Sequence, residues 1–282
     1  MAKITAALIK ELRDATGAGM MDVKKALTEA EGDVARAKEI IRAKGIQAAG
    51  KREGRKAQEG LIASTIADTA DGQVAYAVEL NSETDFVAKT PQFVEFGDEV
   101  VADVAKADAK TTEDVLKAAS KSGTVNETIE EAGALFHEHV KLGQFARVAG
   151  PHVEIYAHHK SVELPPSIVA VIATDDAGAS IAHEVALQIS AMSPKWLRRE
   201  DVPADVVETE TRVATEKSQA EGKPEKIIPR IVEGRLNAFF KETVLLEQEY
   251  VKDTSKTIGD LFKAAGAQAV GFARLEVGKG DE

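Results

Sequence analysis

Residues 81–90 read NSETDFVAKT, and they begin where the most strand-like run of the sequence ends. That run, residues 73–80, reads QVAYAVEL and alternates β-branched, aromatic and small apolar side chains. The dipeptide Asp71-Gly72 just before it is a strong signal for a two-residue hairpin turn. The sequence therefore predicts that the chain reaches residue 81 from an antiparallel sheet.

A short helical turn is predicted directly after this strand. Ser82 is a candidate N-cap, and Asp85 stands three residues later, where its carboxylate can complete a capping box. The turn would then present Asp85 and Phe86 at its start. Two interpretations are open on these residues alone: a helix cap beside one core phenylalanine, which is the commoner arrangement, or a carboxylate and an aromatic ring displayed for binding.

The decapeptide TDFVAKTPQF, which starts at Thr84, resembles the signature of the elongation factor Ts family, the bacterial guanine-nucleotide exchange factors of elongation factor Tu. Other segments are similar to the same family: LRDATGAGMMDVKKALTEAEGD from Leu12, GKPEKI from Gly222, VEGRL from Val232 and LLEQEYVKD from Leu245. The resemblance implies a translation elongation factor. It would bind elongation factor Tu with GDP and promote exchange of GDP for GTP by disturbing the magnesium site.

The resemblance also implies that one short motif dislocates the partner's magnesium ion, namely Thr84, Asp85, Phe86 and Val87. Mg²⁺ demands near-ideal octahedral geometry and binds through few protein ligands, so small displacements of a switch segment weaken it strongly. Phe86 can wedge between elements of the partner's nucleotide domain. Asp85 can compete for hydrogen bonds, or repel acidic groups, that order the magnesium waters.

Further partner contacts are expected at Met20, Met21, Lys24 and His158. Methionine suits a binding surface and a core equally well, so both roles stay open for Met20 and Met21. The flank of His158, HHKSVELPP, departs from the family pattern. The chain also stops soon after Val277, where some relatives add a further helix, so the contact made by such a helix is in doubt.

Hydrophobic periodicity predicts an α+β fold that begins with an N-terminal three-helix bundle. Residues 1–50 hold this bundle, which resembles the ubiquitin-associated type, and its third helix is expected to end at Gly45. Residues 51–59 are a linker; its basic run KREGRK favours a solvated connection over an RNA contact. Residues 60–145 form a first α+β subdomain that carries TDFV and ends with a helix at 124–142.

A second, related α+β subdomain with an antiparallel sheet is predicted for residues 146–282, because the order strand, strand, loop, helix recurs there. A helical hairpin inserted at about residues 201–244 would protrude from it, since Gly222-Lys223-Pro224 marks a helix reversal. We call the residues through which its two helices contact each other the seam of the hairpin. The predicted seam consists of Val206, Val213 and Ala220, at seven-residue spacing, on the first helix and Ile227, Ile231 and Ala238 on the second.

Composition excludes several classes of function. The net charge of −11 argues against direct nucleic-acid binding, which needs a surplus of Lys and Arg. The absence of cysteine removes disulfides, thiolate nucleophiles and Cys-based zinc sites. The first residues lack a signal-peptide pattern, and no apolar run approaches the length of a membrane span. We therefore expect a cytoplasmic protein that does not enter a membrane.

No constellation for catalysis or for a cofactor is recognised. His137-Glu138-His139 and His158-His159 suggest a metal, but residues two apart on a helix do not share a face and adjacent strand residues point oppositely. A phosphate loop is missing too, because Gly278-Lys279 lacks both the preceding Gly and the following Ser or Thr. The chain is expected to have no metal, no cofactor and no enzymatic activity.

Two alternatives to an exchange factor stay open. One is a ubiquitin-associated-type adaptor or scaffold without exchange activity, whose bundle binds a partner passively. The other is a metal-dependent hydrolase that uses the histidines, and it is the weakest. The sequence leaves weak self-association open.

Overall fold

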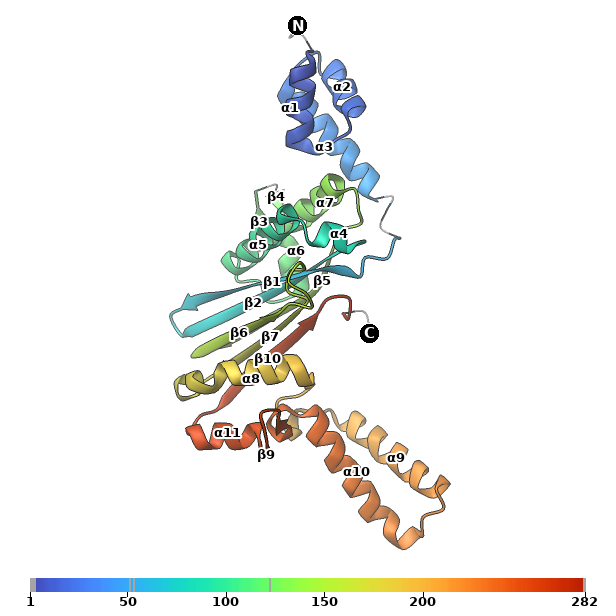
Figure 1. Cartoon of the computed structure of the whole chain (residues 1–282), viewed down its shortest axis with the longest axis vertical. Coiled ribbons are helices and arrows are strands. Elements are labelled where there is room, and N and C mark those ends of the chain that lie inside the picture. Colours follow the sequence, from blue (N-terminus) through green and yellow to red (C-terminus); the bar gives the residue numbers. More distant parts are fainter. Residues whose placement is uncertain (1–3, 51, 53, 122, 281–282) are drawn as a thin grey trace.

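The computed structural model describes residues 4–280 except 51, 53 and 122. Figure 1 shows an elongated molecule with a helical bundle at one end, two sheets in the middle and a helical hairpin at the other end. The bundle consists of α1 (Ala6–Thr16), α2 (Met20–Glu29) and α3 (Val34–Gly50), and the hairpin of α9 (Ala204–Ala220) and α10 (Ile228–Thr243). The predicted α+β class is confirmed.

The N-terminal bundle has a small apolar core of its own. Its buried side chains come from all three helices, with Leu12, Val23, Leu27, Ala37 and Ile40 among them. The bundle packs on helix α7 (Val125–Phe136) of the central body.

The predicted end of the third helix at Gly45 is wrong, because α3 continues to Gly50. Gly45 lies against α7, where a Cβ atom would come within 2.7 Å of the Ala134 Cβ. The glycine therefore serves close packing of two helices and is not a helix C-cap.

The first sheet is antiparallel and has the strand order β1-β2-β5. Its strands are β1 (Glu59–Thr69), β2 (Gly72–Ser82) and β5 (Lys141–Gly150). The hairpin predicted at Asp71-Gly72 is confirmed, since Thr69 pairs with Gly72 across a two-residue turn. Helices α5 (Pro91–Lys106) and α7 cover one face, where Phe93 and Val100 are fully buried.

The helix predicted at residues 124–142 is wrong over its last six residues, 137–142. It ends at Phe136, because His137 adopts the left-handed conformation with φ of 58°. The chain then forms β5, and Gly143 lies inside this strand. A Cβ atom at Gly143 would lie 2.6 Å from the carboxyl carbon of the buried Glu79, so this glycine makes room for Glu79 and does not stop a helix.

The second sheet repeats this arrangement with the strand order β10-β7-β6. Its strands and covering helices are β6 (His152–His158), β7 (Ile168–Thr174), β10 (Ala269–Glu276), α8 (Ala179–Met192) and α11 (Ile258–Ala265). In both sheets the second strand is central and is followed by a long helix. The boundary expected between residues 145 and 146 falls inside β5, so a division there would split the first sheet.

The two sheets pack face to face in the centre of the molecule. Apolar side chains from both sheets are buried between them, including Ile62 and Ala77 from the first and Val169, Val171 and Leu275 from the second. Separate cores fill the outer face of each sheet under its helices. The result is a stack of helices, sheet, sheet and helices (Figure 1).

The protruding hairpin is present as predicted, but its predicted seam is only partly right. Val206 packs against the cluster that contains the buried Phe240, whereas Ala220 and Ala238 are exposed. Val213 and Ile227 are each 45% exposed. The buried side chains lie mostly one residue further along each helix: Ala214, Ser218, Ile228, Val232 and Phe240. Steps of four residues join 214 to 218 and 228 to 232, so the seam follows ordinary i, i+4 helix packing rather than a strict heptad.

The remaining elements are short: α4 (Asp85–Ala88), α6 (Thr112–Lys117), β3 (Ala119–Ser120), β4 (Gly123–Thr124), η1 (Asp176–Gly178), η2 (Arg199–Asp201), η3 (Glu225–Ile227), η4 (Leu245–Glu247), β8 (Glu249–Tyr250) and β9 (Asp253–Thr257). In the described part of the chain, no helix combines the length and the apolarity needed to cross a membrane.

Candidate functional site

The TDFV motif forms a single turn of helix, α4, at the end of the central strand β2. Its N-cap is Thr84, whose Oγ1 accepts a hydrogen bond from the Val87 amide at 3.4 Å. The cap predicted at Ser82 is therefore wrong. Ser82 is the last residue of β2 and is paired with Glu59 in the sheet, so its hydroxyl donates to the Thr84 carbonyl at 3.0 Å instead.

The start of the motif is held by the segment that follows α7. Glu138 accepts two hydrogen bonds from Thr84, one from the backbone amide at 3.0 Å and one from the hydroxyl at 2.5 Å. A second carboxylate, that of Glu83 next to the motif, accepts a hydrogen bond from the backbone amide of His139 at 2.7 Å. It also lies 3.4 Å from the Arg55 guanidinium. We call these four residues, Glu83, Thr84, Glu138 and His139, the reciprocal clamp.

The reciprocal clamp also affects an ionisation. The hydrogen bond from the His139 amide, aided by the charge of Arg55, lowers the pKa of Glu83 below its ordinary value. Glu83 is therefore ionised at neutral pH, and the carboxylate is the form that accepts these hydrogen bonds.

The four residues of the motif have different surroundings. Phe86 is 70% exposed, and the Lys89 ammonium lies 4.7 Å from the centre of its ring. Val87 is half-buried and packs against the core of the first sheet. Asp85 is half-buried and lines a cavity of about 340 Å³ together with Lys160, on the loop that joins β6 to β7. The motif thus anchors one side chain, Val87, in the core and displays another, Phe86, to solvent.

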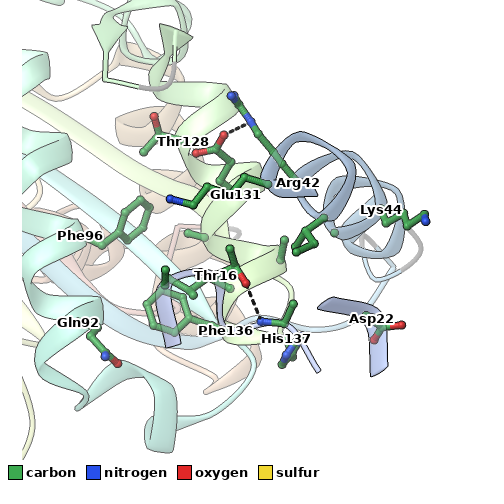
Figure 2. Close-up of a pocket in the computed structure, with 18 of the residues that line it drawn as sticks. Thr16, Asp22, Arg42, Lys44, Gln92, Phe96, Thr128, Glu131, Phe136 and His137 are labelled. Atoms are coloured by element: carbon green, nitrogen blue, oxygen red, sulfur yellow. Dashed lines mark hydrogen bonds and ion pairs between the residues drawn. The ribbon is translucent and has the colours of Figure 1, made fainter. Parts of the chain in front are cut away.

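A larger cavity, of about 850 Å³, lies between the N-terminal bundle and the central body, beside the contact of α3 with α7 (Figure 2). Phe96 and Phe136 form part of its apolar wall. An ion pair between Arg42 of α3 and Glu131 of α7 closes one side of the cavity. The bundle is thus joined to α7 by close contacts, with a gap beside them.

The other predicted contact residues lie on separate elements. Met20, Met21 and Lys24 are on the exposed side of α2, with Met20 and Met21 61% and 64% exposed. This exposure decides against the core role that was open for the two methionines. His158 is half-buried at the end of β6, where its Nδ1 lies 3.3 Å from the Tyr156 hydroxyl.

Sequence reasoning missed Glu138 and Glu83. Glu138 is 54 residues from Thr84, and no periodicity or spacing links the two positions. The one available signal is the string His137-Glu138-His139, which does not indicate a partner in the distant motif. Among the described residues, no group of three or more His, Asp or Glu side chains is placed to hold a metal ion.

The chain thus combines two stacked antiparallel sheets of the same strand arrangement, a one-turn helix with an exposed phenylalanine, and a helical bundle with its own core. The sequence model described as elongation factor TS matches residues 83–279. Over all 282 residues the chain is 76% identical to elongation factor Ts of Bifidobacterium animalis subsp. lactis, of which it covers 99%. It is 72% identical to elongation factor Ts of Bifidobacterium longum, with both chains covered completely.

A more distant relative gives the same result. The chain is 49% identical over 279 residues to elongation factor Ts of Kocuria rhizophila, with 99% of this chain and 100% of the relative covered. The chain belongs to the elongation factor Ts family, a family of translation elongation factors.

Proposed function

We propose that the protein binds elongation factor Tu in its GDP form and promotes release of GDP and its replacement by GTP. The observation that carries the proposal is the geometry of α4, in which Phe86 is displayed to solvent from a turn that is fixed on both sides. An exposed aromatic ring on a turn that is already held in place is available for burial by a partner, and aromatic side chains are frequent anchors of protein interfaces.

The proposed mechanism acts on the partner's magnesium ion. Phe86 enters a gap between elements of the partner's nucleotide domain, where burial of its ring drives binding. Asp85 perturbs the groups that order the magnesium waters, and Thr84 and Val87 hold the turn in place. Because Mg²⁺ tolerates little distortion of its octahedral shell, GDP loses an important ligand and leaves.

Partner contacts outside the motif are proposed at Met20, Met21 and Lys24 of the bundle and at His158 of β6. The exposure of the two methionines supports this role, since flexible apolar side chains adapt well to a binding surface. The bundle, residues 1–50, would dock on the partner's nucleotide domain.

We also propose a division of the chain that follows the sheets. Residues 51–58 would link the bundle to a first α+β subdomain, because Glu59 already belongs to β1, and a second subdomain would follow with the helical hairpin inserted. The boundary belongs after residue 150 rather than 145, because β5 completes the first sheet.

In this proposal the protein acts by binding and performs no covalent chemistry. It works on the partner's nucleotide without contacting nucleic acid or a membrane, and it does so in the cytoplasm. The alternative is an adaptor that binds a partner through the bundle without exchange. Weak self-association stays an open part of the proposal.

Release of a fluorescent GDP analogue from elongation factor Tu tests the proposal. Catalytic amounts of this protein should accelerate release in the presence of magnesium, whereas an adaptor would leave the rate unchanged. The control is Ile66→Ala, a partly exposed apolar residue near the other end of β1, which should behave as the wild type.

A further inference from the structure

The reciprocal clamp fixes the point at which α4 begins. Both carboxylate oxygens of Glu138 accept hydrogen bonds from one residue, Thr84. Thr84 is also the N-cap of the turn. Hydrogen bonds to an ionised acceptor are stronger and shorter than neutral ones. The backbone direction of the turn is therefore set by a residue that is not part of the motif.

Glu138 reaches Thr84 because of the way α7 ends. His137 takes the left-handed conformation with φ of 58°, which turns the chain out of the helix axis. The next two residues then face the motif, Glu138 through its side chain and His139 through its amide. Glu83 accepts that amide, so each segment supplies one carboxylate to the other.

Helix α7 also carries the contacts of the N-terminal bundle. Arg42 of α3 pairs with Glu131, and Gly45 of α3 packs against Ala134. These contacts lie on the last two turns of α7, and Glu138 follows the same helix. One helix thus supports both the bundle and α4, and it sets the spacing between them.

We propose that Glu138 is a positioning residue for nucleotide exchange: through Thr84 it fixes the orientation of Phe86 relative to α7 and the bundle. This inference rests on the proposed exchange function. Without Glu138 the turn still forms on its N-cap, but its direction is no longer fixed. The turn must then become ordered during the step in which GDP is released. The free energy needed for this ordering raises the barrier of that step and slows it.

The test compares Glu138→Ala with Glu138→Gln and with the matched control Glu130→Gln. Glu130 is an exposed glutamate of α7 that accepts a hydrogen bond from Asn126 and does not contact the motif. GDP release is measured over a range of factor concentrations, which separates the maximal rate from the half-saturating concentration. Melting curves are recorded for every variant.

We expect Glu138→Ala to lower the maximal rate about tenfold, equivalent to about 1.4 kcal/mol. Its half-saturating concentration should change by less than about threefold, because the other contact regions still bind. Glu138→Gln retains an acceptor for the Thr84 amide and should recover part of the rate. Glu130→Gln should match the wild type.

A second comparison asks whether Glu138 acts through Phe86. In a Phe86→Ala background, Glu138→Ala should cause a much smaller further loss of rate, since only Asp85 is then left for the turn to orient. A second variant, Thr84→Val, removes the hydroxyl that donates to Glu138. It replaces Glu138→Ala in the rate measurements if that variant is poorly folded. Because the same hydroxyl is also the N-cap of α4, this variant should reduce the maximal rate at least as much.

Wild-type rates for Glu138→Ala and Thr84→Val, or full additivity with Phe86→Ala, would overturn the inference. So would a loss of rate that merely follows a loss of folded protein in the melting curves. Failure of the wild-type protein to accelerate GDP release would instead overturn the proposed function itself, so the two failures are distinguishable.

Discussion

Asp85 and Phe86 are neighbours in one turn of helix, yet they meet different surroundings. The Phe86 ring projects into solvent beside Lys89, whereas Asp85 lies half-buried at a cavity that Lys160 also lines. The residue that gives this turn its direction, Glu138, comes from another part of the chain. At the scale of single residues, the site is therefore an exposed side chain together with the partly buried hydrogen bonds that hold its turn.

The lowered pKa of Glu83 predicts a pH dependence of stability. A carboxyl whose pKa is depressed by folding stabilises the folded state above its unfolded pKa, which is about 4.5 for Glu83. This contribution is lost as the pH falls through the lower folded pKa. We expect Glu83→Gln to reduce the free energy of unfolding at pH 7, and this difference from the wild type should shrink below about pH 4.

Urea unfolding at several pH values checks this expectation. The control is Glu233→Gln, which removes one carboxylate from the exposed side of α10. A difference between wild type and Glu83→Gln that is the same at pH 7 and pH 3 would mean that the carboxylate is not what stabilises the clamp.

At the scale of elements, the sequence predicts what is decided locally. The capping box of Thr124 and Glu127 and that of Thr257 and Asp260 both begin helices in the structure. Their hydrogen bonds join residues three positions apart, so the pattern is visible in the sequence.

Two of the errors come from glycines that pack against residues distant in the chain. Gly45 and Gly143 look like helix stops, but they make room for Ala134 and Glu79 respectively. The site follows the same rule: TDFV is recognisable as a motif, whereas its link to Glu138 depends on how α7 packs against the first sheet.

The base of the helical hairpin is anchored by a buried amide network. Gln248, which lies within the family segment LLEQEYVKD, donates to the carbonyls of Met192 and Glu242 at 3.3 and 2.8 Å and accepts from Gln188 at 3.2 Å. Both glutamine side chains are fully buried. Loss of one amide would therefore leave several polar groups without partners in the core.

Gln248→Met is predicted to destabilise the protein by about 2 to 3 kcal/mol, because a side chain of similar size removes the hydrogen bonds without creating a large cavity. Equilibrium unfolding in urea measures the change. Gln219→Met, at an exposed position of α9, is the control and should have little effect. Equal stability of the two variants would show that the network does not anchor the hairpin.

At the scale of the whole molecule, the bundle and the sheets have separate cores. The bundle core contains only residues of the N-terminal helices and their flanks, and the three cores of the sheets contain none of them. Contact between the two parts is concentrated on α3 and α7, with the large cavity beside it (Figure 2). Such an arrangement favours independent folding of the sheets.

Removal of residues 1–50 should leave residues 51–282 folded, with a single cooperative transition in urea. The shortened protein should bind elongation factor Tu more weakly, since it lacks the proposed contacts of α2. Titration calorimetry measures this affinity, and the full-length variant Met21→Ala is the control that weakens binding without removing the bundle. Gradual unfolding of the shortened protein would refute the independence of the sheets.

The central claim is that Phe86 and Asp85 act on the magnesium site of the partner, and GDP release at high and low magnesium tests it most directly. Phe86→Ala should weaken the free energy of binding to elongation factor Tu by roughly 2 to 4 kcal/mol, the range for truncation of a buried interface anchor. It should also slow GDP release at both magnesium concentrations. Asp85→Ala should slow release mainly when magnesium is abundant and should approach the wild type when magnesium is chelated.

Melting curves accompany these rates, because Asp85 and Phe86 could serve only the fold. The account predicts stable variants, with a defect that depends on magnesium for Asp85→Ala and a loss of rate at both concentrations for Phe86→Ala. Variants that melt early, and whose defect is the same with and without magnesium, would contradict it.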